Sequence, residues 1–348
     1  MMAILTNHWF ERITGFPEAG YTETQERLRV EDGFLISETS GIKHAVGDLE
    51  FPSLDDLRRN AENVRVPGDL SLEIVEGDVR SMHADALNSG AVFQVASQFN
   101  LLEMVGPNVT PEAGVTRYAY DNTQGPACAI AAGAGTIWRN YLVPIKNQLG
   151  QTAERQLDGL EELGDLLARD MGLEPGSLWK MRNGYALPEH TMLARMEEHL
   201  ESLSETERDR LRGLLRVGVH RHVGVTEDGA PPDMRVTQVY CSALPVAYSG
   251  ILKPEWTRLA SLVLEAAYEA TFLAAVINAS QGFSNRLLLT RLGGGAFGND
   301  EAWISAAILR ALHITAHQGL DVVMVSHGPP SSAVRAVEAD WREAHDIP

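Results

Sequence analysis

Residues 287–312 read LLLTRLGGGAFGNDEAWISAAILRAL, and this stretch decides the fold. The apolar run from Leu287 to Leu292 is followed by three glycines, by a further glycine at Gly298 and then by a helical pattern. Glycines let the backbone adopt positive φ and turn several N–H groups toward one point. A helix N-terminus adds partial positive charge. The sequence therefore predicts a strand, an anion-binding turn and a helix, an arrangement that suits a ligand with a diphosphate.

Three other interpretations of the turn compete with this one. A P-loop needs a lysine and a serine or threonine after its last glycine, but asparagine and aspartate follow Gly298. The G-x-G-x-x-G pattern of dinucleotide-binding folds is met literally from Gly293 onward, yet the acid of the next strand, Asp321, precedes that strand (Val322 to Ser326) instead of ending it. A glycine turn that only packs a helix on a sheet is the third alternative.

The segment GGGAFGND, residues 293–300, resembles the second phosphate-binding loop of macrodomains, commonly written G-[IV]-[FY]-G after a buried strand. The matching positions are Gly295, Ala296, Phe297 and Gly298. In that family the aromatic residue of the loop covers the face of a ribose. The resemblance therefore implies a ribose and a diphosphate beside this turn, and Phe297 over the ribose ring.

A second block strengthens the resemblance. Residues 74–87, IVEGDVRSMHADAL, are similar to the family's early GD[IV]-x5-DA[IL] segment, and Gly77, Asp78, Asp85 and Ala86 match with the usual spacing. In the family the aspartate of the GD pair lies beside the adenine amino group. The resemblance covers about Leu70 to Tyr141 and Val236 to Gly328.

One departure suggests a branch of the family. A typical macrodomain has NAAN and then a GGG loop after the DA[IL] segment, whereas this chain has Asn88-Ser89-Gly90 and then VFQVASQFNLLEM. That run resembles a divergent, poly(ADP-ribose) glycohydrolase-like branch, in which a glutamine or glutamate near the loop acts on the distal ribose. The resemblance implies an α/β fold, a three-layer α/β/α macrodomain-like sandwich with a mixed sheet.

The implied activity is that of a hydrolase, which binds ADP-ribose and cleaves an ADP-ribosyl linkage on a protein or on a small molecule. A non-catalytic reader of ADP-ribosylated protein and an NAD-dependent oxidoreductase remain as alternatives. The residues expected to bind the ligand are Asp78, Val79, Asn88, Gln98, Asn100, Gln124, Gly293, Gly294, Gly295, Ala296, Phe297, Gly298 and Asn299.

A long polar loop supplies candidates for the chemistry. Residues 94–124 hold many acids and amides in one connection, and such loops are usually functional. Hydrolysis of a glycosidic bond needs a carboxylate near C1 of the ribose. The candidates are Glu103, Glu112 and Asp121, with Gln98, Asn100 and Gln124 as amides for ribose hydroxyls. Each acid could instead be a surface charge. Downstream, Gly133 to Gly135 could form a second backbone cradle or pack on the sheet.

The 348 residues fit one core with additions better than two domains. We expect an N-terminal extension (1–65) and a core (66–348) interrupted by a helical insertion (146–216). The insertion is expected to be a lid, a partner surface or a solvated hairpin. The elements expected are a hairpin (34–36 and 42–46), helices (53–61, 151–171, 189–215, 256–277) and strands (72–75, 84–87, 217–225, 236–243, 287–292, 322–326).

The composition limits the possible partners. A net charge of −18 argues against a broad nucleic-acid surface, and no apolar run reaches the roughly 18 residues of a membrane span. Two cysteines and no signal-peptide pattern indicate a cytoplasmic protein. No cofactor and no metal are expected, because the pairs His220/His222 and His313/His317 each lack a clear third ligand.

Overall fold

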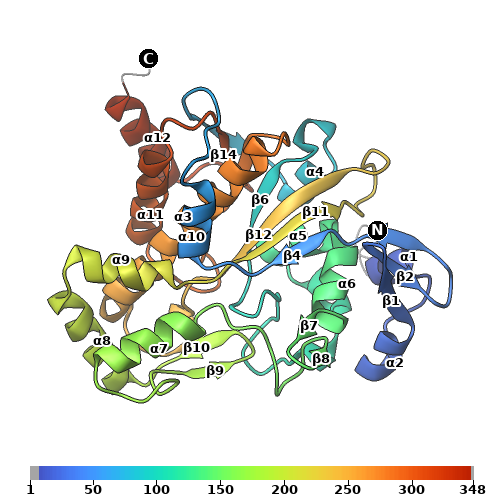
Figure 1. Cartoon of the computed structure of the whole chain (residues 1–348), viewed down its shortest axis with the longest axis horizontal. Helices are drawn as coiled ribbons and strands as arrows, with labels where there is room; N and C mark the ends of the chain where they lie inside the picture. Colours follow the sequence, from blue (N-terminus) through green and yellow to red (C-terminus); the bar gives the residue numbers. More distant parts are fainter. Residues whose placement is uncertain (1–7, 346–348) are drawn as a thin grey trace.

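The computed structural model describes residues 8–345, and its centre is a seven-stranded mixed sheet in the order β4-β11-β12-β6-β13-β14-β5 (Figure 1). The strands span Asp48–Glu50 (β4), Gly218–Gly224 (β11), Arg235–Cys241 (β12), Val92–Ala96 (β6), Arg286–Leu289 (β13), Asp321–Ser326 (β14) and Ser71–Glu76 (β5). The five from β12 to β5 are parallel, and β11 is antiparallel to both of its neighbours. The carboxyl ends of five neighbouring strands therefore lie along one edge of the sheet.

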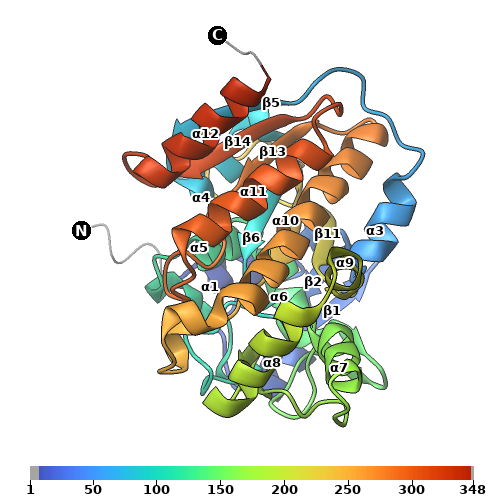
Figure 2. The same cartoon turned by 90° about the vertical axis from the view of Figure 1, so that its left-hand side faces the viewer.

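Helices cover both faces of the sheet, so the predicted three-layer α/β/α sandwich is confirmed (Figures 1 and 2). On one face lie α3 (Leu54–Ala61), α10 (Thr257–Ser280), α11 (Glu301–Ile314) and α12 (Ser332–Ala344), and on the other α4 (Val79–His83), α5 (Gln124–Ala131) and α6 (Gly133–Tyr141). Because side chains of a strand alternate between faces, Leu287 and Leu289 pack against α10 and α11, whereas Leu288 packs with Val79 and Cys128 on the other face.

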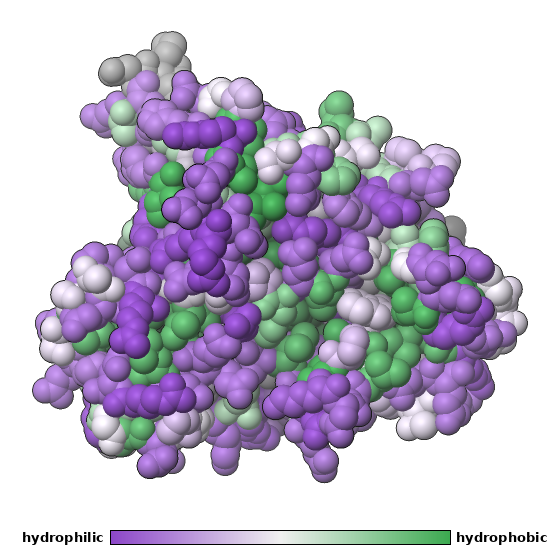
Figure 3. Space-filling view, in the orientation of Figure 1, coloured by the Kyte–Doolittle hydropathy of each residue, from purple (hydrophilic) through white to green (hydrophobic). Residues whose placement is uncertain are grey.

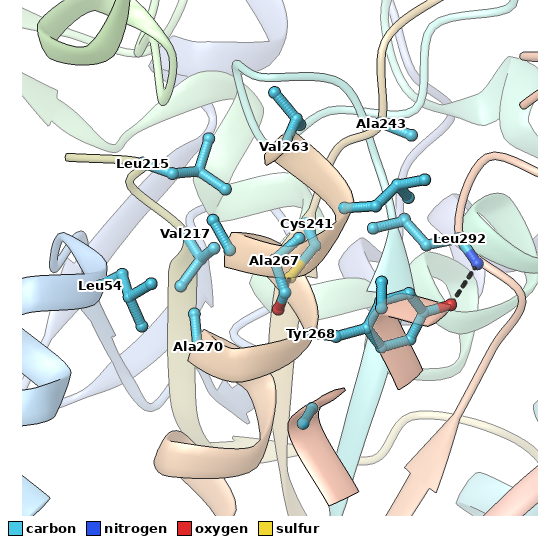
Figure 4. Close-up of a cluster of buried hydrophobic side chains, with 14 of the residues drawn as sticks. Leu54, Leu215, Val217, Cys241, Ala243, Val263, Ala267, Tyr268, Ala270 and Leu292 are labelled. Carbon is cyan, nitrogen blue, oxygen red and sulfur yellow. Dashed lines mark hydrogen bonds between the residues drawn. The ribbon is translucent and has the colours of Figure 1, made fainter. Parts of the chain in front are cut away.

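The longest helix, α10, is the centre of the larger hydrophobic core. Figure 4 shows Val263, Ala267 and Ala270 of α10 among apolar residues of other elements, including Leu54 and Val217. The stretch Lys253–Ser280 is long and apolar enough to cross a membrane by length and composition, but 89% of its most apolar window is buried inside the protein. Small alanines let α10 approach α11 and the sheet closely, which explains an apolar helix with no polar face.

The N-terminal segment contains short elements on the flank of α6. They are α1 (Trp9–Thr14), α2 (Tyr21–Glu26), β1 (Leu28–Glu31), β2 (Phe34–Ser37) and β3 (Lys43–Ala45). The expected hairpin is present as the antiparallel pair β2–β3, and β1 adds a third strand. The predicted helix after Ser53 is also present, and its N-terminus is closed by a reciprocal capping box between Ser53 and Asp56.

The segment 146–216 is less helical than expected. It contains β8 (Gln148–Leu149, paired with β7, Pro144–Ile145), α7 (Glu161–Asp170), the hairpin β9 (Lys180–Arg182) and β10 (Tyr185–Leu187), α8 (His190–Ser202) and α9 (Glu205–Gly213). The predicted helix 151–171 is therefore shorter, and the predicted helix 189–215 is two helices, because Ser204 caps α9 through a box with Glu207. In Figure 3 the face is mostly hydrophilic, with hydrophobic residues in recesses between this segment and the core.

One further prediction on local structure is wrong, and for Gly133 to Gly135 the structure decides between the two alternatives. Residues 84–87 are not a strand, because Asp85 accepts a hydrogen bond from Leu87 N and starts a single 3-10 turn, Ala86–Asn88. The glycines at 133 and 135 do not form a cradle for a ligand. They lie in α6, where a Cβ on Gly135 would stand 2.6 Å from Val223 of the sheet and a Cβ on Gly133 would stand 2.4 Å from Ile13 of α1, so they allow close packing of α6 against both.

Candidate active site at the carboxyl ends of the parallel strands

Two adjoining cavities lie where the parallel strands end. Cavity A has a volume of about 280 Å³ and cavity B of about 220 Å³, and both are lined by Thr123, Gln124, Thr290 and Arg291. Since they share these four residues, we treat them as one trough that passes the ends of β5, β14, β13 and β6. Open α/β sheets bind ligands in such a crevice.

Cavity B is formed by the ends of β5 and β14. Asp78 and Val79 follow β5 there, and Ser326, the last residue of β14, and His327 also line the cavity. Asp78 also caps α4, because its Oδ1 accepts a hydrogen bond from Arg80 N at 3.0 Å. The structure thus places two of the expected ligand residues together at one end of the trough.

The glycine turn follows β13 and lies in the wall of cavity A. Positive φ angles occur at Gly293 (74°) and Gly298 (71°), which lets the chain fold back sharply. Of the residues expected to bind, Gly293, Gly295, Ala296 and Phe297 line cavity A. Gly294, Gly298 and Asn299 do not, and Asn299 instead donates from Nδ2 to Leu244 O at 2.8 Å, which fixes the turn.

The N-terminus of α11 does not provide the expected anion site. Its N-cap, Asp300, accepts a hydrogen bond from Ala302 N at 2.9 Å, so a carboxylate of the protein already occupies this end. A different helix start faces the trough. The first turn of α5, from Gln124 to Pro126, lines cavity A, and its N-cap Thr123 makes no capping hydrogen bond through its side chain. The sequence analysis missed this helix start because the run after Thr123 contains glycine and proline.

A single strong cation lies in the middle of the trough. Arg291 lines both cavities and forms an ion pair with Glu301. It is the one lysine or arginine among the described residues that line the trough. The sequence analysis did not select Arg291, although its position between a strand end and a glycine turn was the available signal.

Glu103 is the most unusual side chain in cavity A. It is 2% exposed, and neither carboxyl oxygen has a hydrogen-bond partner among residues 8–345. Burial raises its pKa to about 8, although the positive charge of Arg139 acts in the opposite direction. Its backbone N–H donates to the hydroxyl of Tyr118 at 3.0 Å, which holds this part of the loop in place. Glu103 therefore combines a buried carboxyl group, a raised pKa and a place in the lining of cavity A.

The other two candidate acids, Asp121 and Glu112, differ in whether they line the trough. Asp121 lines cavity A and accepts a hydrogen bond from Thr123 N at 2.9 Å, just before α5. Glu112 does not line the trough, and its Oε1 accepts a hydrogen bond from Ala153 N at 2.9 Å. The structure therefore brings Glu103 and Asp121 together and gives Glu112 a place in loop packing.

The candidate amides also divide. Gln98 lines cavity A, and Gln124 lines both cavities while its Oε1 accepts from Ala96 N at 2.9 Å. Asn100 and Asn88 line neither cavity. The side chain of Asn100 donates to Gln156 at 2.7 Å, and that of Asn88 donates to Met82 O at 2.9 Å. These two asparagines thus stabilise loop structure outside the trough.

Three aromatic rings that contact one another form part of the wall of cavity A. The ring centroids of Tyr185, Tyr248 and Phe297 lie 5.2 to 5.7 Å apart, so the rings are in mutual contact. Tyr185 is buried, and its hydroxyl donates to Met104 O at 2.7 Å, whereas Tyr248 is 38% exposed at the rim. Because Tyr185 belongs to β10, the segment 146–216 contributes directly to the wall of the site. No sequence motif marks Tyr185 or Tyr248.

The histidine pairs lie apart from the trough. A bulge between His220 and Val223 breaks the strand, so His220 is buried whereas His222 stacks on Phe283 with centroids 4.0 Å apart. Among residues 8–345 no group of three or more metal-binding side chains could hold an ion.

No protein-family model matches this chain, and no curated protein matches it either. Among solved structures, it is similar to poly(ADP-ribose) glycohydrolase from Thermomonospora curvata (15% identity, 92% of this chain and 96% of that chain, TM-score 0.45). It is also similar to that enzyme bound to the inhibitor ADP-HPD (15%, 92% and 96%, 0.44) and to poly(ADP-ribose) glycohydrolase from Deinococcus radiodurans in complex with ADP-ribose (13%, 86% and 94%, 0.43).

Proposed function

We propose that the protein binds ADP-ribose along the trough and hydrolyses an ADP-ribosyl linkage. The adenosine would occupy cavity B, the diphosphate would cross the shared middle, and the distal ribose would lie in cavity A. Each region offers the matching chemistry: a carboxylate acceptor in cavity B, a cation with a helix start in the middle, and a buried acid with a ring wall in cavity A.

At the adenosine end, Asp78 supports the proposal. Its carboxylate lines cavity B and uses Oδ1 for Arg80 N and Oδ2 for the hydroxyl of Ser81, at 3.0 and 3.2 Å. Each carboxylate oxygen accepts more than one hydrogen bond. The carboxylate can therefore accept a hydrogen bond from the adenine amino group while it caps α4.

In the middle of the trough, three features favour an anion. Arg291 supplies a positive charge, the first turn of α5 directs backbone N–H groups toward its N-terminal end, and Gly295, in the adjoining wall of cavity A, offers backbone without a side chain. A Cβ on Gly295 would meet no atom within 4 Å, so open space adjoins this part of the turn. A diphosphate fits the combination of one cation and uncovered backbone.

The observation that carries the proposal is the unpartnered, buried carboxyl of Glu103 in the wall of cavity A. A buried acid without a partner is unfavourable for folding, so a role in chemistry explains it better than a role in stability. A pKa near the working pH suits a group that both accepts and donates a proton. During hydrolysis a water oxygen bonds to C1 of the ribose, the bond to the leaving atom breaks, and Glu103 transfers one proton of that water to the leaving group.

The test compares the parent protein with Glu103→Gln, which keeps the shape of the side chain. Calorimetry should show that both bind ADP-ribose, and release of ADP-ribose from modified substrates should fall by about 10²–10⁴-fold in the variant. Binding without cleavage of any linkage by the parent would make the protein a non-catalytic reader. Tighter binding of NAD than of ADP-ribose, with reduction to NADH, would overturn the proposal altogether.

A further inference from the structure

Cavity A, to which the proposed function assigns the distal ribose, combines a ring wall with two carboxyl groups in its lining. Tyr185, Tyr248 and Phe297 come from three separate parts of the chain and contact one another there. Glu103 and Asp121 line the same cavity. The only lysine or arginine among its described lining residues, Arg291, lies in the shared middle and is already paired with Glu301.

Rings beside carboxylates are a recognised arrangement for cations. The face of an aromatic ring carries partial negative charge and attracts guanidinium and other cations. A flat cation can stack on such a wall while its edge donates hydrogen bonds to a carboxylate. Resting on the proposed function, we infer that the group bonded to C1 of the distal ribose is a planar cation, either the guanidinium of a modified arginine or the pyridinium of a nicotinamide nucleotide.

Electrostatics disfavour the alternative of a polyanionic leaving group. If the leaving group were a further ADP-ribose unit, it would bring a second diphosphate to cavity A. Asp121 lines this cavity, Glu103 in the same lining becomes negative as the pH rises toward its pKa of about 8, and the chain carries a net charge of −18. Repulsion between these negative charges and a second diphosphate would weaken the binding of poly(ADP-ribose). A neutral hydroxyl leaving group, for its part, makes no use of the combined ring wall and carboxyl groups.

The bond changes differ between the two sources of the cation. In a guanidino linkage the C1–N bond breaks with its electron pair going to nitrogen, water bonds to C1, and Glu103 carries the water proton to the released guanidine, which becomes guanidinium. In a pyridinium linkage the amide-bearing ring leaves neutral, so the water proton passes through Glu103 to solvent. The medium therefore gains a proton only with the nicotinamide nucleotide.

The experiment compares kcat/KM of the parent protein on four substrates: an ADP-ribosylarginine peptide, NAD, an ADP-ribosylserine peptide and poly(ADP-ribose). We expect one of the two cationic linkages to be cleaved at least about tenfold more efficiently than either O-linked substrate. Proton release in weak buffer separates the arginine source from the nicotinamide source. Cleavage of an O-linked substrate with equal or higher efficiency would overturn the inference while the proposed hydrolase function stands. If ADP-ribose binds but all four substrates stay intact, both are wrong.

Tyr248 allows the ring wall to be tested without disturbing the core, because it lies at the rim. Tyr248→Leu should lower kcat/KM on the cationic substrate by about five- to tenfold, the range expected for a lost cation–π contact, and Tyr248→Phe should retain it. Phe283→Leu, an exposed aromatic beside a different cavity, is the control and should leave activity unchanged. An equal loss of kcat/KM in Tyr248→Leu and Tyr248→Phe would show that the face of the ring does not bind the cation.

Discussion

The hydroxyl of Tyr268 accepts a hydrogen bond from Leu292 N at 2.9 Å and so ties the middle of the core helix α10 to the glycine turn (Figure 4). The same hydroxyl donates to Thr290 O at 2.7 Å. Arg291 lies between these two anchored residues and lines both cavities of the trough. The buried hydroxyl of Tyr268 therefore fixes the position of the backbone on both sides of Arg291, in the middle of the trough.

Removal of this hydroxyl should weaken ligand binding as well as lower the free energy of unfolding. Tyr268→Phe leaves Leu292 N–H and Thr290 C=O without their partner, which costs about 1–3 kcal/mol. We expect the free energy of unfolding to fall by that amount and the affinity for ADP-ribose to fall with it. The matched control is Tyr141→Phe, which removes a buried hydroxyl bonded to Glu18; neither residue lines the trough. Denaturant titration and calorimetry should give similar stability losses but an affinity loss only in Tyr268→Phe.

A side chain at Gly295 should block the ligand without unfolding the protein. The position has no positive φ, contrary to one possibility raised by the sequence, and a Cβ there meets nothing within 4 Å. Gly295→Val should therefore keep its free energy of unfolding within about 0.5 kcal/mol and lose ADP-ribose binding, because the new side chain fills part of cavity A. Gly20→Val, another position with open space, should leave binding unchanged. If Gly295→Val binds ADP-ribose as tightly as the parent protein, the glycine turn has a structural role only.

The adenine contact can be separated from helix capping. Asp78 and Asp85 each cap a helical turn through a 3.0 Å bond, but only Asp78 lines the trough. Replacing either by alanine should cost about 1 kcal/mol of stability. Asp78→Ala should also weaken ADP-ribose binding by roughly 10- to 100-fold, the effect of losing a hydrogen bond to a charged group. If Asp78→Ala and Asp85→Ala bind ADP-ribose with the same affinity, Asp78 does not contact the adenine.

Activity on a cationic linkage should rise with pH. The leaving group departs neutral, so Glu103 is needed in its ionised form, and its pKa in the free protein is about 8. Since kcat/KM reports the free enzyme, it should increase as pH rises through about 8 and then level off. An O-linked substrate that needs a protonated Glu103 would show the opposite slope. Measurement of kcat/KM from pH 6 to pH 9.5 on both linkage types shows in which protonation state Glu103 acts. The same pH profile in the parent and in Glu103→Gln would contradict a role for Glu103 in the reaction.

Stability should depend on pH in the opposite direction. The pKa of Glu103 is raised from 4.5 to about 8 in the folded state, so the folded protein binds more protons than the unfolded chain between these values. The contribution of Glu103 to stability is therefore fully present below about pH 4.5 and is lost as pH rises through 8. In Glu103→Gln this loss disappears, and the variant should be more stable than the parent at pH 9. Parallel pH–stability curves for the two proteins would show that Glu103 ionises freely.

Much of the architecture follows from local sequence signals. The apolar run before Gly293 predicted β13, the serine at 53 predicted the start of α3, and the apolar stretch after Trp256 predicted α10. These signals are local because strand burial, capping and helical apolarity depend on neighbouring residues. The motif around Asp78 also contains residues that line one end of the trough.

The rest of the site depends on contacts between distant segments. Glu103, Glu112 and Asp121 look alike in one polar loop, and only the packing of Tyr118 and α5 decides which acids face the cavity. Tyr185 lies in a hairpin whose sequence carries no binding motif, yet it stands in the wall because β10 reaches cavity A. Burial of this kind is a property of the tertiary structure, so no pattern within one segment reveals it.

The strand order has a consequence for biosynthesis. β5 and β6 follow each other in the chain, but in the sheet they are separated by β13 and β14, which are synthesised last. Until residue 326 has left the ribosome, β5 has no strand to pair with in the sheet, and most of the apolar surface of the nascent chain lacks α10 and α11. Such long-range pairing is slow and leaves strand edges open to aggregation. Truncation before β14 should therefore yield insoluble protein rather than a smaller folded unit, and expression should benefit from chaperones that hold unfinished chains.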